Sequence, residues 1–160
     1  ALPTLTYRSP LTLYMNGEEI RLIPVPTAHT DGDTMIRFKA ADALMTGDFY
    51  RSIQYPNIDR NNGGTVRGMI DGLQMIVDEA TPTTKIIPGH GPVVDESSVV
   101  AHRALLIAAR DKVAGLIKQG QTLEQIVAAK PFAEFDAKVS QPGTTGDRFI
   151  GQLYGELGGK

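Results

Sequence analysis

The hydrophobic pattern of this chain changes its period at Thr65, and that change restricts the folds it can adopt. Before Thr65, apolar and polar residues alternate in short runs, as in the strands of a sheet. After it, apolar residues recur at helical spacing, as on one face of a helix. These residues are Val66, Met69, Ile70, Leu73, Ile76 and Val77. Strands followed by helices predict an α/β protein with helices on one face of a mixed or antiparallel sheet.

Two hairpins are predicted in the first part of the chain. The alternating runs are 11–15, 18–25, 34–40 and 43–49. Asn16-Gly17 separates the first two runs and is a strong signal for a two-residue hairpin turn. The polar segment 50–64 is predicted to be a loop. A fifth strand, residues 84–90, follows the first helix, which Thr81-Pro82 ends.

Three helices are predicted after the last strand. The longest covers about 97–120, and its last residue is a glycine, which is typical of the position after a helix end. Thr122 and Gln125 form a capping-box pair at the start of a short helix that stops before Pro131. Residues 147–157 show helical spacing again. No repeat or linker interrupts the chain, so we expect a single domain.

Length and composition limit the possible functions. Residues 1–160 are enough for one domain with a hydrophobic core. A net charge of -2 argues against nucleic-acid binding by phosphate neutralisation. The lack of cysteine excludes disulfides, thiolate zinc sites and a cysteine nucleophile. No apolar run approaches the ~20 residues that span a bilayer. Because the chain begins with Ala1, we expect a processed or truncated start, and the sequence does not predict a compartment.

Two of the three histidines follow predicted strand ends. His29 comes after the second alternating run, and His90 closes the fifth strand between two glycines. Asp48 closes another apolar strand, directly after a glycine. Strand ends are where α/β proteins tend to build sites, so the three side chains are expected at one edge of the sheet. Imidazole and carboxylate together suit zinc, iron or manganese.

Structural roles remain open for several of these polar residues. A lone histidine or aspartate at a strand end is often a turn residue or a local cap. Asp31 and Asp33 are predicted to form the turn after His29. His102 lies in the long helix and is predicted to be a surface or half-buried structural residue.

Three residues that follow Asp48 are candidates for binding a substrate. Tyr50, Arg51 and Tyr55 lie in the loop after the fourth strand. They either line a pocket beside Asp48 or pack the loop, and the sequence does not decide between these alternatives.

Three segments resemble, in order, the last three metal-ligand motifs of the metallo-β-lactamase superfamily. They are "AHTDGDTMI", "LMTGDFY" and "IIPGHGPV". The spacing is also similar, with 19 residues from His29 to Asp48 and 42 from Asp48 to His90. The resemblance implies half of an αββα sandwich, in which two metal ions usually lie between two sheets.

The resemblance also implies a role for each matching residue. His29 corresponds to the third ligand of the first metal, and His90 to the last ligand of the second. Asp48 corresponds to the catalytic carboxylate that bridges both ions. The implied cofactor is zinc, with iron or manganese as alternatives, and the implied substrate is a small molecule. In the family, a hydroxide between the metals attacks a carbonyl, phosphoryl or sulfuryl centre.

One family motif has no counterpart in this chain. The first motif, a His-x-His-x-Asp-His run, normally supplies ligands to both metals, and nothing here matches it. Three histidines cannot build a site that usually needs five. The chain therefore corresponds to the C-terminal half of the fold and is expected to be inactive alone.

Half a sandwich leaves one sheet face without its usual cover. The residues expected on this uncovered face are Leu11, Leu13, Met15, Ile20, Leu22, Ile36 and Phe38. Exposed apolar patches of this kind usually mark an interface. We expect the partner to be either a missing N-terminal half or a second copy of the chain.

The alternatives to half of a hydrolase are a non-catalytic assembly or ligand-binding domain, and a homodimer that completes a metal site between two chains.

Overall fold

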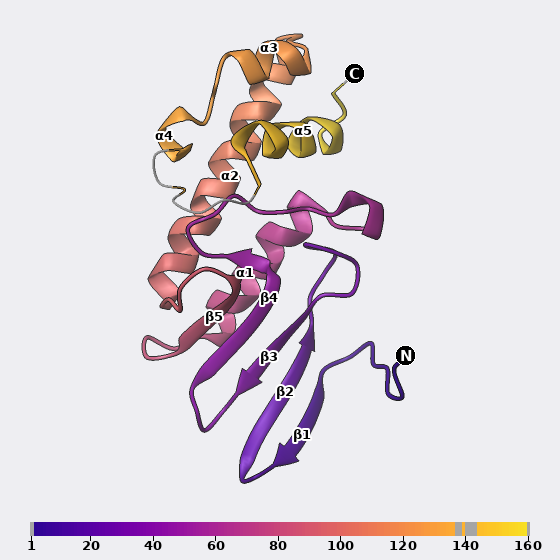
Figure 1. Ribbon diagram of the computed structural model, residues 1–160, viewed down its shortest axis with the longest axis vertical. Helices are drawn as coiled ribbons and strands as arrows, with labels where there is room; N and C mark the ends of the chain where they lie inside the picture. Colours follow the sequence, from indigo (N-terminus) through magenta and orange to yellow (C-terminus); the bar gives the residue numbers. More distant parts are fainter. Residues whose placement is uncertain (1, 137–138, 140–143, 160) are drawn as a thin grey trace.

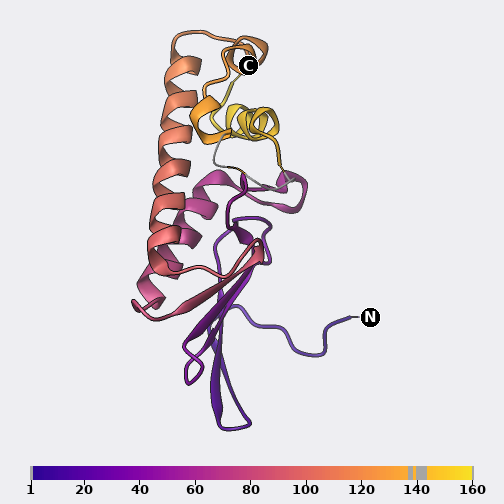
Figure 2. The same ribbon diagram turned by 60° about the vertical axis from the view of Figure 1, so that its left-hand side comes forward.

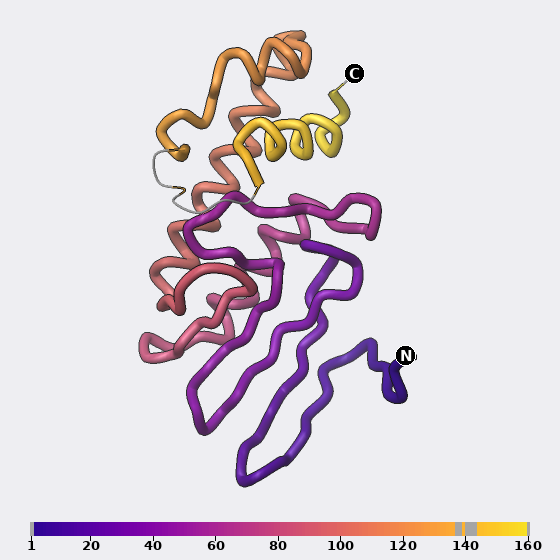
Figure 3. Tube along the Cα trace, in the orientation of Figure 1, coloured from indigo at the N-terminus to yellow at the C-terminus, as the bar shows by residue number. Residues whose placement is uncertain are grey.

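The computed structural model describes residues 2–136, 139 and 144–159. They form a five-stranded sheet with helices beside it and beyond one of its ends (Figures 1 and 3). The strands are β1 (Leu11–Met15), β2 (Glu18–Pro24), β3 (Thr34–Phe38), β4 (Ala43–Arg51) and β5 (Lys85–His90). Their order in the sheet follows the chain. The pairs are antiparallel except β4–β5, which is parallel, so the sheet is mixed.

The helices lie beside one face of the sheet or beyond one of its ends (Figures 1 and 2). They are η1 (Arg60–Asn62), α1 (Val66–Glu79), α2 (Glu96–Lys118), α3 (Leu123–Ala128), α4 (Ala133–Asp136) and α5 (Gly146–Glu156). Figure 2 shows α1 and α2 on the same side of the sheet, with the N-terminal segment on the other. The predicted fold class, α/β with helices on one face, is confirmed. No helix in the described residues is long and apolar enough to cross a membrane.

Backbone conformation and side-chain caps explain where the first hairpin turns and where α1 and α2 begin. Asn16 and Gly17 both have positive φ angles, 53° and 76°, as the tight turn between β1 and β2 requires. α1 begins after Thr65 because the Thr65 side chain accepts a hydrogen bond from the Gly68 N–H at 2.9 Å. Asp95 caps α2 in the same way, by accepting from the Ser98 N–H at 3.0 Å.

The structure corrects two predicted strand ends and adds one helix. β2 ends at Pro24, so His29 lies in the loop that follows and not directly at the strand end. β4 extends to Arg51, so Asp48 lies inside this strand and does not close it. The extension arises because the pairing with β5 shifts register around Gly47, which lets Arg51 pair with His90. The short helix α4 was not predicted from the sequence.

The hydrophobic core lies between the sheet and α1 and α2. One side chain from each of four adjacent strands faces the helices and is at most 5% exposed: Ile23, Met35, Leu44 and Ile86. α1 contributes Met69, Leu73 and Ile76 to this core, all almost completely buried. The apolar residues that recur at helical spacing after Thr65 therefore lie on the face of α1 that packs on the sheet.

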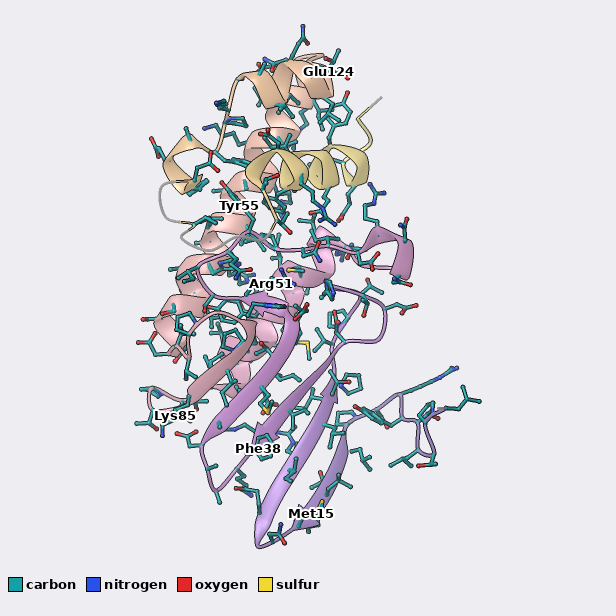
Figure 4. All side chains as sticks on the ribbon, viewed as in Figure 1. Met15, Phe38, Arg51, Tyr55, Lys85 and Glu124 are labelled. Carbon is teal, nitrogen blue, oxygen red and sulfur yellow. The ribbon has the colours of Figure 1, made fainter. Side chains whose placement is uncertain are left out.

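The opposite face of the sheet is apolar and uncovered in the part of the chain that the structure describes. Rows of paired residues cross it, and Leu22, Ile36, Met45 and Ile87 form one such row. Met45 is 41% exposed, and the other three are partly exposed. Figure 2 shows no helix on this side, and Phe38 and Met15 are labelled on the sheet in Figure 4. This is the face that the sequence predicts to be bare.

Neighbouring residues in β3 test the difference between the two faces. Met35 is fully buried under the helices, whereas Ile36 lies on the open face. Met35→Lys should lower the free energy of unfolding by more than about 3 kcal/mol, because it buries a charge without a partner. Ile36→Lys should lower it by less than about 1 kcal/mol, because the ammonium group can reach water. Urea unfolding followed by circular dichroism measures the free energy of unfolding of both variants. Equal losses of stability would contradict the assignment of the two faces.

Candidate metal centre

The carboxylate of Asp48 lies between two imidazole rings at the end of the sheet where β4 and β5 stop. The Nε2 atom of His29 is 3.8 Å from its Oδ2 atom. The Nε2 atom of His90 is 3.3 Å from its Oδ1 atom. The side chains of His29, Asp48 and His90 are 18%, 33% and 49% exposed, so the cluster is open to solvent. The structure therefore brings together the three residues that the sequence singled out.

Two loops hold His29 in place. The backbone N–H of His29 donates to Asp33 Oδ2 at 2.7 Å, so Asp33 forms the turn predicted for it. The His29 carbonyl accepts from the Asp59 N–H at 2.9 Å, which ties this loop to the segment before α1. The His29 ring is oriented by the Asn57 carbonyl, 2.6 Å from Nδ1.

The contact with Asn57 also determines the tautomer of His29. A carbonyl oxygen can only accept, so Nδ1 of His29 carries the proton and donates it. In the neutral ring, Nε2 then presents a lone pair toward Asp48 Oδ2. Two acceptors face each other across 3.8 Å, and a cation between them would satisfy both. Histidines that bind metals are commonly oriented in this way by a second hydrogen bond to a carbonyl.

Asp48 is also held by its own strand and by β5. Arg51 donates from Nη2 to Asp48 Oδ2 at 2.9 Å. Burial alone would raise the pKa of Asp48, but the hydrogen bond and charge of Arg51, with smaller contributions from the two histidines, lower it below its ordinary value. The carboxylate is therefore ionised. Gly89 is required in β5, because a Cβ there would collide with Asp48 Oδ1 and the Gly47 backbone.

The three side chains suit a bridging carboxylate better than a single three-ligand site. At metal–ligand bonds of about 2.0–2.2 Å, tetrahedral donors lie roughly 3.3–3.5 Å apart. The His90–Asp48 and His29–Asp48 separations of 3.3 and 3.8 Å are near this spacing, and each involves a different carboxylate oxygen. Within residues 2–136, 139 and 144–159, no three histidine or carboxylate groups come together to hold one ion. Each ion would thus receive two donors from this chain.

The candidate substrate residues lie in two different places. Arg51 contacts Asp48 and belongs to the cluster. Tyr50 and Tyr55 are each only 2% exposed and line a cavity beside α2. Asp48, His29 and His90 are not among the residues that line this cavity. Figure 4 labels Arg51 on β4 and Tyr55 in the segment that follows it. A role of these three residues in substrate binding stays a prediction.

His102 has a more specific environment than the sequence indicates. It is half-buried, as predicted, and its ring packs edge-on against Tyr50 with centroids 5.3 Å apart. It also lines the same cavity as Tyr50. Burial lowers the pKa of His102 to about 4, so the ring is neutral at pH 7. The sequence shows only a histidine in a helix, because its neighbours in the cavity come from a distant segment.

Comparison with known proteins identifies the fold. No protein-family model and no curated protein matches the chain. Among solved structures, it resembles the metallo-β-lactamase from Pontibacter korlensis at 20% identity and a TM-score of 0.57, over 66% of this chain and 49% of that one. It resembles a metallo-β-lactamase family protein from Thermus thermophilus at 18% identity and a TM-score of 0.60, over 72% of this chain and 39% of that one.

A third similar structure extends over the C-terminal helices as well. The stereoselective inverting sec-alkylsulfatase Pisa1 from Pseudomonas sp. is 14% identical, with a TM-score of 0.67, over 98% of this chain and 26% of that one. The chain spans between about a quarter and a half of the length of these three structures. At such low identities the likeness shows the fold, which is half of a metallo-β-lactamase sandwich.

The neutral state of His102 predicts how stability depends on pH. The unfolded chain takes up the His102 proton near pH 6.5, but the folded chain does so only near pH 4. Stability should therefore fall as the pH drops from 7 to 4, by on the order of 2 kcal/mol from this residue alone. His102→Phe should remove that part of the pH dependence. Urea midpoints of both proteins at pH 7, 5.5 and 4 measure this dependence, and parallel pH profiles would contradict the neutral state of the folded His102 ring.

Proposed function

We propose that this chain is the C-terminal half of a metal-dependent hydrolase, in which His29, Asp48 and His90 hold part of a two-metal site. The observation that carries the proposal is the position of the Asp48 carboxylate, whose Oδ2 atom lies 3.8 Å from His29 Nε2 and whose Oδ1 atom lies 3.3 Å from His90 Nε2. Zinc is the proposed metal, because two imidazoles and one carboxylate, without thiolates, match its ligand preferences. When bound, it supplies Lewis acidity and lowers the pKa of water.

The residues of this chain have separate tasks in the proposed site. His29 presents Nε2 in a fixed direction, because its Nδ1 proton is held by the Asn57 carbonyl. Asp48 offers one oxygen toward each histidine and so can bridge two cations. Arg51 keeps Asp48 ionised and in place through its 2.9 Å hydrogen bond. The Asp48 carboxylate is therefore the proposed catalytic group of this half.

The remaining ligands must come from outside the chain. Each ion would receive two donors here, whereas zinc is normally held by at least three protein ligands. We propose that a second sheet packs on the open face and supplies them, and that it belongs to an N-terminal half of the same protein. The share of the similar structures that this chain covers, 26–49%, supports that choice. A second copy of the chain is the alternative partner.

The similarity to the alkylsulfatase suggests which substrates to test first. The metallo-β-lactamase likeness covers 66% of the chain, whereas the alkylsulfatase likeness covers 98% and includes the C-terminal helices. We therefore propose sulfate esters of small alcohols as the first substrate class to assay, with lactams as the second. A non-catalytic ligand-binding domain remains the alternative function, and it requires no metal.

Metal binding by the purified chain tests the proposal. The chain, prepared without chelators, should bind zinc, and His29→Ala or His90→Ala should each weaken the binding at least about tenfold. Isothermal titration with zinc at pH 7 gives the affinity, and elemental analysis gives the stoichiometry. His102→Phe is the matched control, because His102 lies outside the cluster.

The control separates specific binding from incidental histidine binding. Equal losses of zinc affinity in all three variants would mean that zinc binds to individual histidines and not to a defined site. No zinc binding by the unaltered chain, with unchanged stability in His29→Ala and His90→Ala, would favour the non-catalytic alternative.

A further inference from the structure

A cavity lies beside α2, apart from the residues of the Asp48 cluster. It has a volume of about 450 Å³ and lies between residues 50–55, the first half of α2 and α4. Its walls include Ile53, Val94, Leu105 and Phe135, which make it largely apolar. Its size falls in the range of about 300–1,000 Å³ that is typical of small-molecule sites. None of His29, Asp48, Arg51 and His90 lines it.

Three polar side chains of this cavity lack hydrogen-bond partners. In the described part of the chain, no hydrogen bond reaches the ring nitrogens of His102 or the hydroxyl of Tyr50, although both residues line the cavity. The side-chain oxygen of Gln54 is buried without a partner, and Gln54 as a whole is only 8% exposed. The Gln54 oxygen is the buried one of these unpaired groups, and a ligand or water in the cavity would pair with it and with the free His102 nitrogens and Tyr50 hydroxyl.

The cavity contains no charged side chain among its described residues. Lysine, arginine, aspartate and glutamate are all missing from the described residues that line it. The His102 ring is neutral at pH 7, because burial lowers its pKa to about 4. A charged ligand would thus lose its hydration without gaining a counter-charge. The described lining therefore favours an uncharged ligand over a charged one.

The polar groups also restrict the ligand's chemistry. A neutral imidazole provides one donor and one acceptor, and the Tyr50 hydroxyl can do either. Gln54 adds an acceptor oxygen. We propose that this cavity binds an uncharged, largely apolar alcohol or phenol, whose hydroxyl group pairs with His102 and Tyr50. This site is independent of the metal centre and does not rest on the hydrolase proposal.

Three naphthalene derivatives of similar size distinguish the proposed chemistry. 2-Naphthol carries the hydroxyl group, 2-methoxynaphthalene lacks the donor, and 2-naphthoate is charged at pH 7. Titration calorimetry with the complete chain should show 2-naphthol binding about tenfold more tightly than the methyl ether, since the ether leaves the acceptors unpaired. 2-Naphthoate should not bind measurably.

Variants of the cavity locate the binding. His102→Phe keeps an aromatic ring beside Tyr50 but removes the nitrogens, so it should abolish the preference for 2-naphthol over the ether. Ala104→Trp, at an exposed position on the cavity wall, should block both 2-naphthol and 2-methoxynaphthalene while leaving the core intact. Ile36→Lys on the open sheet face is the control and should leave the affinity for 2-naphthol unchanged.

The same experiment can overturn the proposal. Equal affinities for 2-naphthol, 2-methoxynaphthalene and 2-naphthoate would show that the polar groups select nothing and that water alone satisfies them. Loss of binding in Ile36→Lys, with retention in Ala104→Trp, would place the ligand on the open sheet face and not in the cavity.

Discussion

The parallel pairing of β4 with β5 is the interaction on which both the core and the candidate site depend. A parallel pair cannot be joined by a tight turn, so the chain must cross over between the strands, and α1 makes that crossover. α1 therefore covers one face of the sheet. Because parallel strands end at the same edge, the pairing also brings Asp48 and His90 together.

The two faces of the sheet have different relations to the candidate site. The helix-covered face provides the stability, through residues such as Met35 and Leu44 that are fully buried. The open face is apolar but partly exposed, and it ends at the edge where the Asp48 cluster lies. A partner sheet on that face would bury the apolar rows and reach the cluster at the same time. The proposed partner sheet would therefore account for both the incomplete ligand set and the uncovered face.

The sequence predicts most of the fold, because its signals there are local. The Asn16-Gly17 turn, the Thr65 cap and the helical spacing of α1 each act over a few residues, and the structure contains all three. The end of β4 was predicted wrongly, because the register shift near Gly47 depends on pairing with a distant strand. The cavity at His102 was missed for the same reason, since its walls come from segments far apart in the chain.

The most direct test is ¹⁵N NMR of the histidine rings during a zinc titration. Zinc should shift the Nε2 signals of His29 and His90, while Nδ1 of His29 keeps the proton that it donates to Asn57. The His102 signals should stay unchanged, because that ring lies in a separate cavity. Zinc binding at Nδ1 of His29, or no response from His29 and His90, would contradict the claim that these two rings and Asp48 form half of a metal site.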